Sequence, residues 1–147
     1  MMLRKRTLHT GMTLIEILIT VAIVGALATI AIPAMGSYLV KSERSRVQVD
    51  LYQLQVHTEQ FFTENNWTFP DNKKLICSKC KVSEEYDFSI DTSGTGNSAY
   101  VINAKPKSTS RQDNDKDCHT MAINAASEQL NFKKDGAGIS DNNKCWI

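Results

Sequence analysis

Residues 12–40 read MTLIEILITVAIVGALATIAIPAMGSYLV, and this stretch decides the architecture of the chain. Of its residues, 21 are apolar, and the 24 residues from Ile17 to Val40 carry no charge. A helix of 24 residues spans about 36 Å, which exceeds the roughly 30 Å hydrocarbon core of a membrane. Basic residues at positions 4–6 precede the run and predict that this end stays in the cytoplasm. The run therefore predicts a membrane-spanning helix.

Gly11 and Glu16 distinguish the start of this run from that of an ordinary secretory signal peptide. A secretory signal peptide ends in a small-residue cleavage site after a short apolar stretch, whereas Gly11 lies before a long one. Glu16 breaks the apolar pattern, and an ionised carboxylate inside a membrane costs on the order of 3 kcal/mol. Cleavage after Gly11 would give Met12 a free α-amine about one helical turn from Glu16. We therefore expect Glu16 to pair with this amine, in its own chain or a neighbouring one; the alternative places Glu16 at the headgroup level.

The sequence Gly11-Met12-Thr13-Leu14-Ile15-Glu16, behind a basic leader, resembles the class III signal of a type IV prepilin. The resemblance implies that residues 1–11 are a leader that a membrane peptidase removes, and that Met12, where the family usually has Phe, is then N-methylated. It implies that Glu16 docks the subunit into a filament by pairing with a neighbour's N-terminus. Pro33 inside the helix predicts a kink there or melting of residues 25–33, with tolerance of this proline and of Gly25 as the alternative. The resemblance implies that this segment loses helicity when the subunits pack.

Residues 41–64 predict that the helix continues into water, so that it runs from about Met12 to Glu64. Residues at three- and four-residue steps predict one buried stripe: Val47, Leu51, Leu54, Thr58 and Phe61. Asn65 and Asn66 predict the helix end. Near this end, His57 is interpreted as a surface or packing residue rather than a metal ligand. We expect Trp67 and Phe69 to pack in the core or against the helix, with an exposed ligand platform as the alternative.

The rest of the chain predicts a small antiparallel sheet after a loop at residues 65–85. Alternating apolar residues and turn signals predict four strands, at residues 86–91, 99–105, 119–124 and 129–133. Inward-facing positions are expected at Met121, Ile123, Leu130 and Phe132. One face of the sheet can cover the apolar stripe of the helix. The predicted fold is therefore α+β, with residues 12–40 as a membrane and assembly helix and residues 41–147, called the head, as the globular part.

The head contains the four cysteines Cys77, Cys80, Cys118 and Cys145. The basic N-terminus places the head outside the cytoplasm, where disulfides are the default. Four cysteines allow three pairings. We favour Cys77–Cys80 and Cys118–Cys145, since the family that the sequence resembles commonly closes its C-terminal loop with a disulfide. The final Cys145-Trp146 also resembles a minor pilin of the PilE kind.

Two other uses of the cysteines remain open from the residues alone. The spacing of Cys77 and Cys80 is that of redox enzymes, although no helical pattern follows it. Zinc ligation by these two residues with Cys118 and either His119 or Cys145 is a second alternative. We expect neither, and we predict no metal site and no cofactor.

The charge pattern excludes some classes of protein. The chain has 17 Lys and Arg against 16 Asp and Glu, a formal charge of +1, which is far from the strongly basic balance of a nucleic-acid coat. The densest basic group is a candidate patch for DNA phosphates or another anionic partner, with a solvated loop as the alternative: Lys73, Lys74, Lys79 and Lys81. Nucleophile triads, phosphate loops and paired catalytic carboxylates do not stand out in the sequence, so we predict no enzyme.

These features together predict a structural subunit of a type IV pilus, most like a minor pilin. The resemblance implies single-pass insertion in the inner membrane with the head in the periplasm, followed by assembly into an extracellular filament that serves twitching, adhesion or DNA uptake. Implied partners are other pilin subunits, prepilin peptidase, the assembly platform and membrane lipid, with nucleic acid as a further candidate. The alternatives are a low-copy tip or DNA-binding module and a pseudopilin of a type II secretion system. Pseudopilin heads often bind calcium through clustered acids, and acids alternate here at Asp113, Asp115 and Asp117.

Overall fold

A computed structural model describes residues 12–70, 77, 79–141 and 144–146 of the chain, so the expected leader lies outside the described residues. One long helix precedes four strands and two short 3₁₀ turns. In chain order they are α1 (Leu14–Glu64), β1 (Tyr86–Asp91), η1 (Gly96–Ser98), β2 (Val101–Pro106), η2 (Arg111–Asn114), β3 (Thr120–Asn124) and β4 (Gln129–Phe132). The chain divides into two compact units, with the boundary between Tyr38 and Leu39.

Both ends of α1 are explained by local chemistry. At its start, the hydroxyl and backbone N–H of Thr13 both bond the carboxylate of Glu16. At its end, Asn66 adopts a positive φ of 52° and the N–H of Trp67 donates to the carbonyl of Phe62 at 3.0 Å, the pattern of a Schellman cap. The predicted end of the helix at Glu64 is confirmed.

The described part of the first unit is helical from Leu14 onward, including Gly25 and Pro33. Pro33 has no N–H, so it cannot donate to the carbonyl of Thr29 one turn earlier. The structure shows residues 25–33 as helix in a single chain. Loss of helicity on packing among neighbours stays a prediction about the filament.

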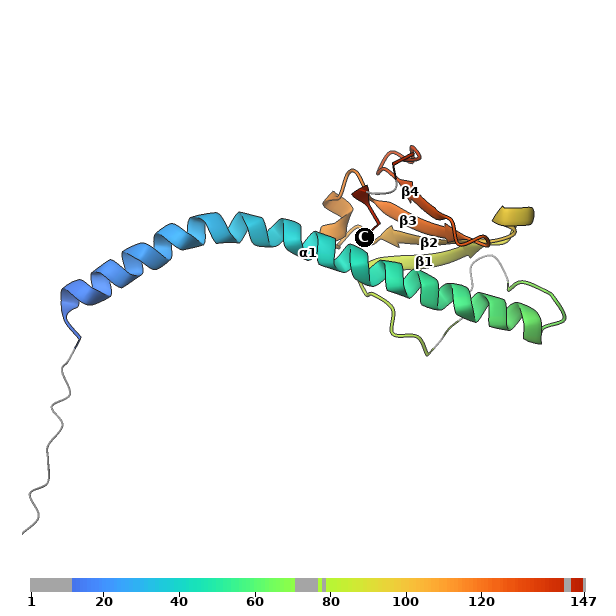
Figure 1. Ribbon diagram of the computed structural model, residues 1–147, viewed down its shortest axis with the longest axis horizontal. Helices are drawn as coiled ribbons and strands as arrows, with labels where there is room; N and C mark the ends of the chain where they lie inside the picture. The colour runs from blue at the N-terminus through green and yellow to red at the C-terminus, as the bar shows by residue number, and fades with distance from the viewer. Residues whose placement is uncertain (1–11, 71–76, 78, 142–143, 147) are drawn as a thin grey trace, which may run out of the picture. The chain divides into compact units, whose positions relative to one another are not determined.

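In the second unit, the four strands form one antiparallel sheet, as predicted, and the structure gives their order as β1-β2-β3-β4. Figure 1 shows the sheet lying along the later half of α1. The expected turn between β1 and β2 contains Gly94, where a Cβ would lie 1.9 Å from the carbonyl oxygen of Ser98, so the turn requires glycine at this position.

The core of the second unit lies between α1 and the sheet. Most of the predicted stripe is buried, at Val47, Leu51, Leu54 and Thr58, whereas Phe61 is half-buried. The sheet supplies buried side chains from three strands: Tyr86, Ile90, Ile102, Ala104, Met121 and Ile123. The predicted α+β fold, with a long helix against a four-stranded sheet, is therefore confirmed.

The predicted inward face of β4 is wrong. Met121 pairs with Asn131 and Ala122 pairs with Leu130, and directly opposed residues of an antiparallel pair share a face. Leu130 therefore lies on the face opposite to Met121, and Phe132 lies there too, both half-buried. Asn131 takes the inward position, where its side-chain oxygen accepts the indole N–H of Trp146 at 2.8 Å.

The expected packing of Trp67 is also wrong. Trp67 is 72% exposed, and its ring forms a T-shaped pair with that of Phe62, with 5.4 Å between the centroids. The positive φ of 59° at Trp67 turns the chain sharply after the helix cap. Phe69 behaves as expected, since it stacks on Phe62 at 4.2 Å and meets Tyr100 edge-on.

Candidate functional site

The N-terminal motif forms a capping box in the single chain. The backbone N–H and the hydroxyl of Thr13 each donate to Glu16 Oε2 at 3.1 Å, and the N–H of Glu16 donates back to the Thr13 hydroxyl at 3.3 Å. Sequence reasoning missed this role, although Thr-x-x-Glu before an apolar run is its usual signature. Gly11 lies outside the described residues. The box holds the carboxylate beside the residue that would carry the new α-amine, Met12.

The large apolar side chains of the first part of α1 are exposed among the residues that the structure describes. Their exposed fractions range from 49% at Ile17 to 83% at Leu14. α1 contains a window with a mean hydropathy of 2.5, and its length and composition are sufficient to cross a membrane. So much exposed apolar surface requires lipid or neighbouring helices around it.

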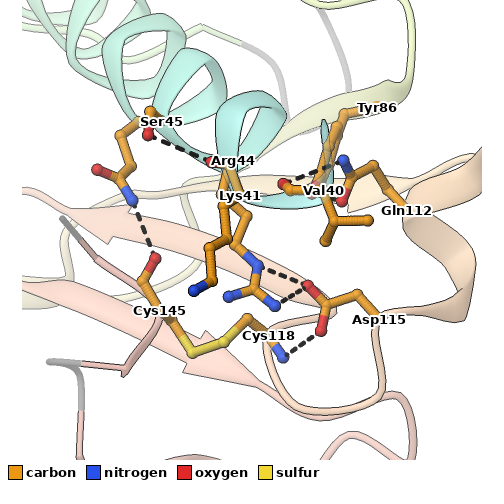
Figure 2. A network of polar contacts seen from close by, with 10 residues as sticks. Val40, Lys41, Arg44, Ser45, Tyr86, Gln112, Asp115, Cys118 and Cys145 are labelled. Carbon is orange, nitrogen blue, oxygen red and sulfur yellow. Dashed lines mark hydrogen bonds and ion pairs between the residues drawn. A yellow bond between two sulfur atoms is a disulfide. The ribbon is translucent and has the colours of Figure 1, made fainter. Parts of the chain in front are cut away.

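A buried ion pair joins the head's helix to the segment before β3 (Figure 2). The guanidinium of Arg44 bonds Asp115, with Nε donating to Oδ2 at 2.6 Å. The second carboxylate oxygen of Asp115 accepts the backbone N–H of Cys118 at 3.1 Å. Nearby, the amide of Gln112 donates to the carbonyl of Val40 at 3.3 Å. These contacts hold the segment 111–118 against α1.

We expect Asp115→Asn to destabilise the head by about 2 kcal/mol, because it leaves the charge of Arg44 unpaired in a site where its side chain is 14% exposed. The measurement is urea unfolding of the full chain in detergent, followed by near-ultraviolet circular dichroism. Asp117→Asn, at an exposed neighbouring acid, is the matched control and should change stability by less than about 0.5 kcal/mol. Equal losses of stability in the two variants would contradict the role of Asp115 as the partner of Arg44.

The cysteines form the two disulfides that the sequence analysis favoured. Cys77 is bonded to Cys80 and Cys118 to Cys145, with Cα separations of 5.3 and 5.5 Å. The second bridge, drawn in Figure 2, is buried. The carbonyl of Cys145 accepts a hydrogen bond from the side-chain amide of Gln48 at 3.0 Å. This bridge therefore ties the end of the chain to both β3 and α1.

The alternating acids do not converge on one site. Asp115 is neutralised by Arg44, and Asp113 accepts a hydrogen bond from Lys134 at 2.6 Å. Asp117 is exposed. In the described part of the chain, the sole group of residues able to share a metal is His57, Cys77 and Cys80. The structure thus gives no support to a calcium site made by these acids.

Asp113 makes the stability of the head depend on pH. The hydrogen bond from Lys134, and after it the one from His119 at 3.2 Å, hold the pKa of this carboxyl below its usual value of 3.8. A group whose pKa is lower in the folded than in the unfolded state stabilises above its unfolded pKa, and this contribution is lost as the pH falls through the folded pKa.

We therefore expect Asp113→Asn to lower the thermal midpoint of the head at about pH 7, and we expect the gap between the two midpoints to narrow as the pH falls through the folded pKa of the wild-type carboxyl. Thermal scans of both proteins across this range measure the difference. If the difference between the two thermal midpoints stays constant down to the lowest pH, then ionisation of Asp113 does not contribute to the stability of the head.

The predicted basic patch is only partly described. Lys73 and Lys74 lie outside the described residues, while Lys79 and Lys81 are exposed. Lys81 and Cys80 line a hollow of about 680 Å³, whose other lining residues are Glu43, Arg46, Val82, Glu84 and Glu85. The hollow beside Lys81 is therefore lined by side chains of both signs of charge.

Comparison with known proteins decides the family. Residues 33–122 match the family described as the type IV minor pilin ComP, DNA uptake sequence receptor. The chain belongs to this family of type IV pilins. The matched range runs from Pro33 through β1 and β2 into β3.

Individual relatives of this pilin agree with that result. The type IV major fimbrial protein FimA of Dichelobacter nodosus is 44% identical over 99 residues, which are 62% of this chain and 60% of FimA. The type IV major pilin PilE of Neisseria gonorrhoeae is 31% identical over 81 residues, or 54% and 48% of the two chains. The type IV major pilin PilA of Myxococcus xanthus is 41% identical over 58 residues, or 40% and 26%. The matches thus span between about a quarter and 60% of these relatives.

Proposed function

We propose that this chain is a structural subunit of a type IV pilus, made as a prepilin and assembled into a surface filament. The observation that carries the proposal is the family match over residues 33–122, on a chain whose helix also presents an uncovered apolar surface. Membership of a family of filament subunits indicates a structural protein, and we propose that it has no enzymatic activity. The family description favours a minor subunit, although the three relatives above are named as major ones.

Processing follows from the N-terminal motif. Prepilin peptidase cuts after Gly11 and the new first residue, Met12, is N-methylated. Until assembly, the apolar run of α1 spans the inner membrane once, with the head in the periplasm. The assembly platform then transfers the helix from lipid into a bundle of other pilin helices, where Glu16 sets the register and Pro33 marks the segment that can loosen.

Intact-mass spectrometry of the chain from sheared filaments and from membranes tests this proposal. The expected filament species lacks residues 1–11, carries one methyl group, and gains four hydrogens on reduction because it has two disulfides. Low abundance relative to the other filament proteins is expected for a minor subunit. A chain that keeps its leader and remains in the membrane would overturn the proposal.

We further propose that the head binds DNA, which the description of its family as a DNA uptake sequence receptor favours. The candidate contacts in the described residues are the exposed Lys79 and Lys81, with Arg46 in the same hollow as Lys81. Lysines that contact phosphates displace condensed counterions, so their contribution appears in the salt dependence of binding. Pilus filaments that carry such a subunit could engage DNA at the cell surface.

We expect the Lys79→Glu, Lys81→Glu variant to bind a labelled DNA duplex about tenfold more weakly than wild type, and to reduce the slope of log K against log salt by about 2. Fluorescence anisotropy at several salt concentrations gives both values. Lys105→Glu, Lys133→Glu is the control, because it changes the net charge equally at two other exposed positions. If the control pair weakens binding as much as the first, the assigned patch is incorrect.

A further inference from the structure

The structure brings one histidine of α1 against the Cys77–Cys80 disulfide. The ligand atoms of His57, Cys77 and Cys80 all lie within 4.8 Å of one another. His57 comes from the last turns of α1, and the two cysteines come from the connection between α1 and β1, about twenty residues later. The sequence analysis assigned His57 no ligand role, because no second ligand lies at helical spacing from it. The fold instead brings Cys77 and Cys80, which come from another part of the chain, close to His57.

The connection to β1 is fastened to the helix beside this group. The backbone N–H of Ser83 donates to the buried carboxylate of Asp50 at 2.8 Å, and the hydroxyl of Ser83 bonds the carboxylate of Glu43. At the cysteines themselves, the N–H of Cys80 donates to the carbonyl of Cys77 at 3.4 Å, which closes a tight turn. These contacts hold the turn against α1 independently of the bond between the two sulfur atoms.

The imidazole is available as a ligand, and the group has access to solvent. Among the residues that the structure describes, His57 makes no hydrogen bond, and its side chain is half-buried. Cys77 is buried, whereas Cys80 is half-buried and lines the hollow of about 680 Å³ described above. An ion can therefore approach from the side of Cys80.

We propose that reduction of the Cys77–Cys80 disulfide opens a zinc site made by the two thiolates and the imidazole of His57. Two cysteines with two residues between them, together with a histidine from another element, are a donor set that zinc prefers, and water can fill the fourth position. The ion therefore binds only when the disulfide is absent, and the redox state of the turn controls its occupancy.

The opening step needs a dithiol reductant. One thiolate of the reductant attacks a sulfur of the disulfide and forms a mixed disulfide, and its second thiol then displaces the protein sulfur. The protein gains two electrons and two protons as two thiols, while the reductant leaves as its own disulfide. Zn²⁺ then replaces the two thiol protons, which pass to solvent.

This site differs from the zinc set weighed in the sequence analysis. Cys118 and Cys145 are each 1% exposed and bonded to each other, and His119 faces Asp113. A mild reductant should therefore reach the Cys77–Cys80 bond first. Under such conditions the chain carries two thiols and one intact disulfide, which is the state that the proposal requires.

The test uses the full chain in detergent micelles. The protein is treated with increasing concentrations of a dithiol, and the reductant is then removed by gel filtration. The free thiols of the protein are counted by alkylation and mass spectrometry. Zinc binding is then measured by competition with a chromophoric chelator, and Co²⁺ replaces zinc to show thiolate charge-transfer bands and the visible bands of a tetrahedral site. We expect no zinc on the oxidised chain and one zinc per chain on the two-thiol species.

Matched variants separate this site from adventitious binding. His57→Gln leaves the disulfide in place and should weaken zinc binding on the two-thiol species on the order of 100-fold. Gln53→Ala, at an exposed position one turn earlier on α1, should leave it unchanged. Zinc binding that is equal in the His57→Gln variant, that appears only after four thiols form, or that is absent from the two-thiol species would each overturn the proposal.

Discussion

Replacing Glu16 with alanine is expected to remove this pilin from sheared surface filaments. In the proposed processing, cleavage after Gly11 leaves a charged amine on Met12, and in the proposed assembly that amine enters a bundle of apolar helices. Without the carboxylate the amine has no counter-charge there, which costs about 3 kcal/mol per subunit and lowers incorporation about a hundredfold. Immunoblots of sheared filaments and of membranes measure the ratio between the two pools.

The capping box provides the control for this experiment. Thr13→Val removes the hydroxyl that bonds Glu16 but keeps the carboxylate. A lost helix cap costs about 1 kcal/mol, so incorporation should fall no more than about fivefold. Wild-type incorporation of Glu16→Ala would contradict the docking role. Equal losses in the two variants would mean that Glu16 acts by capping α1 rather than by pairing between subunits.

Removing the Cys118–Cys145 disulfide is the second large effect. Its cysteines are 27 residues apart, and closing a loop of this size stabilises the folded state by about 3.5 kcal/mol in the chain-entropy description. The bridge also places Trp146, which is 7% exposed and bonded to Asn131, between the helix and β4. We expect Cys118→Ala, Cys145→Ala to lose about that amount in urea unfolding of the full chain, with Trp146 becoming accessible to a fluorescence quencher.

The other disulfide is the matched comparison. Cys77 and Cys80 are three residues apart, so the same description gives about 2 kcal/mol for Cys77→Ala, Cys80→Ala. This variant removes the same number of sulfur atoms but leaves the C-terminal segment tied to β3. A larger loss from the shorter bridge than from the longer one would refute this ranking.

Several features of this fold can be predicted from patterns among residues that are close together in the sequence. The uncharged run to Val40 requires an apolar environment whatever the rest of the chain does, and the motif from Gly11 to Glu16 identifies its start. The end of α1 at Glu64 follows from the conformational freedom of asparagine after it. The alternation at residues 86–91 predicts a strand because side chains of a strand point to opposite faces in turn.

Tertiary structure alone decided which distant residues meet. Pairing Met121 with Asn131 placed an amide in the core and moved Leu130 to the other face, because register and not composition sets which side chains share a face. The sharp turn after α1 left Trp67 exposed, and the fold placed Arg44 against Asp115 and His57 beside Cys77 and Cys80. Periodicity reports only which face of its own element a residue occupies. The partner across the fold depends on how the elements pack, and no single segment of the sequence carries that information.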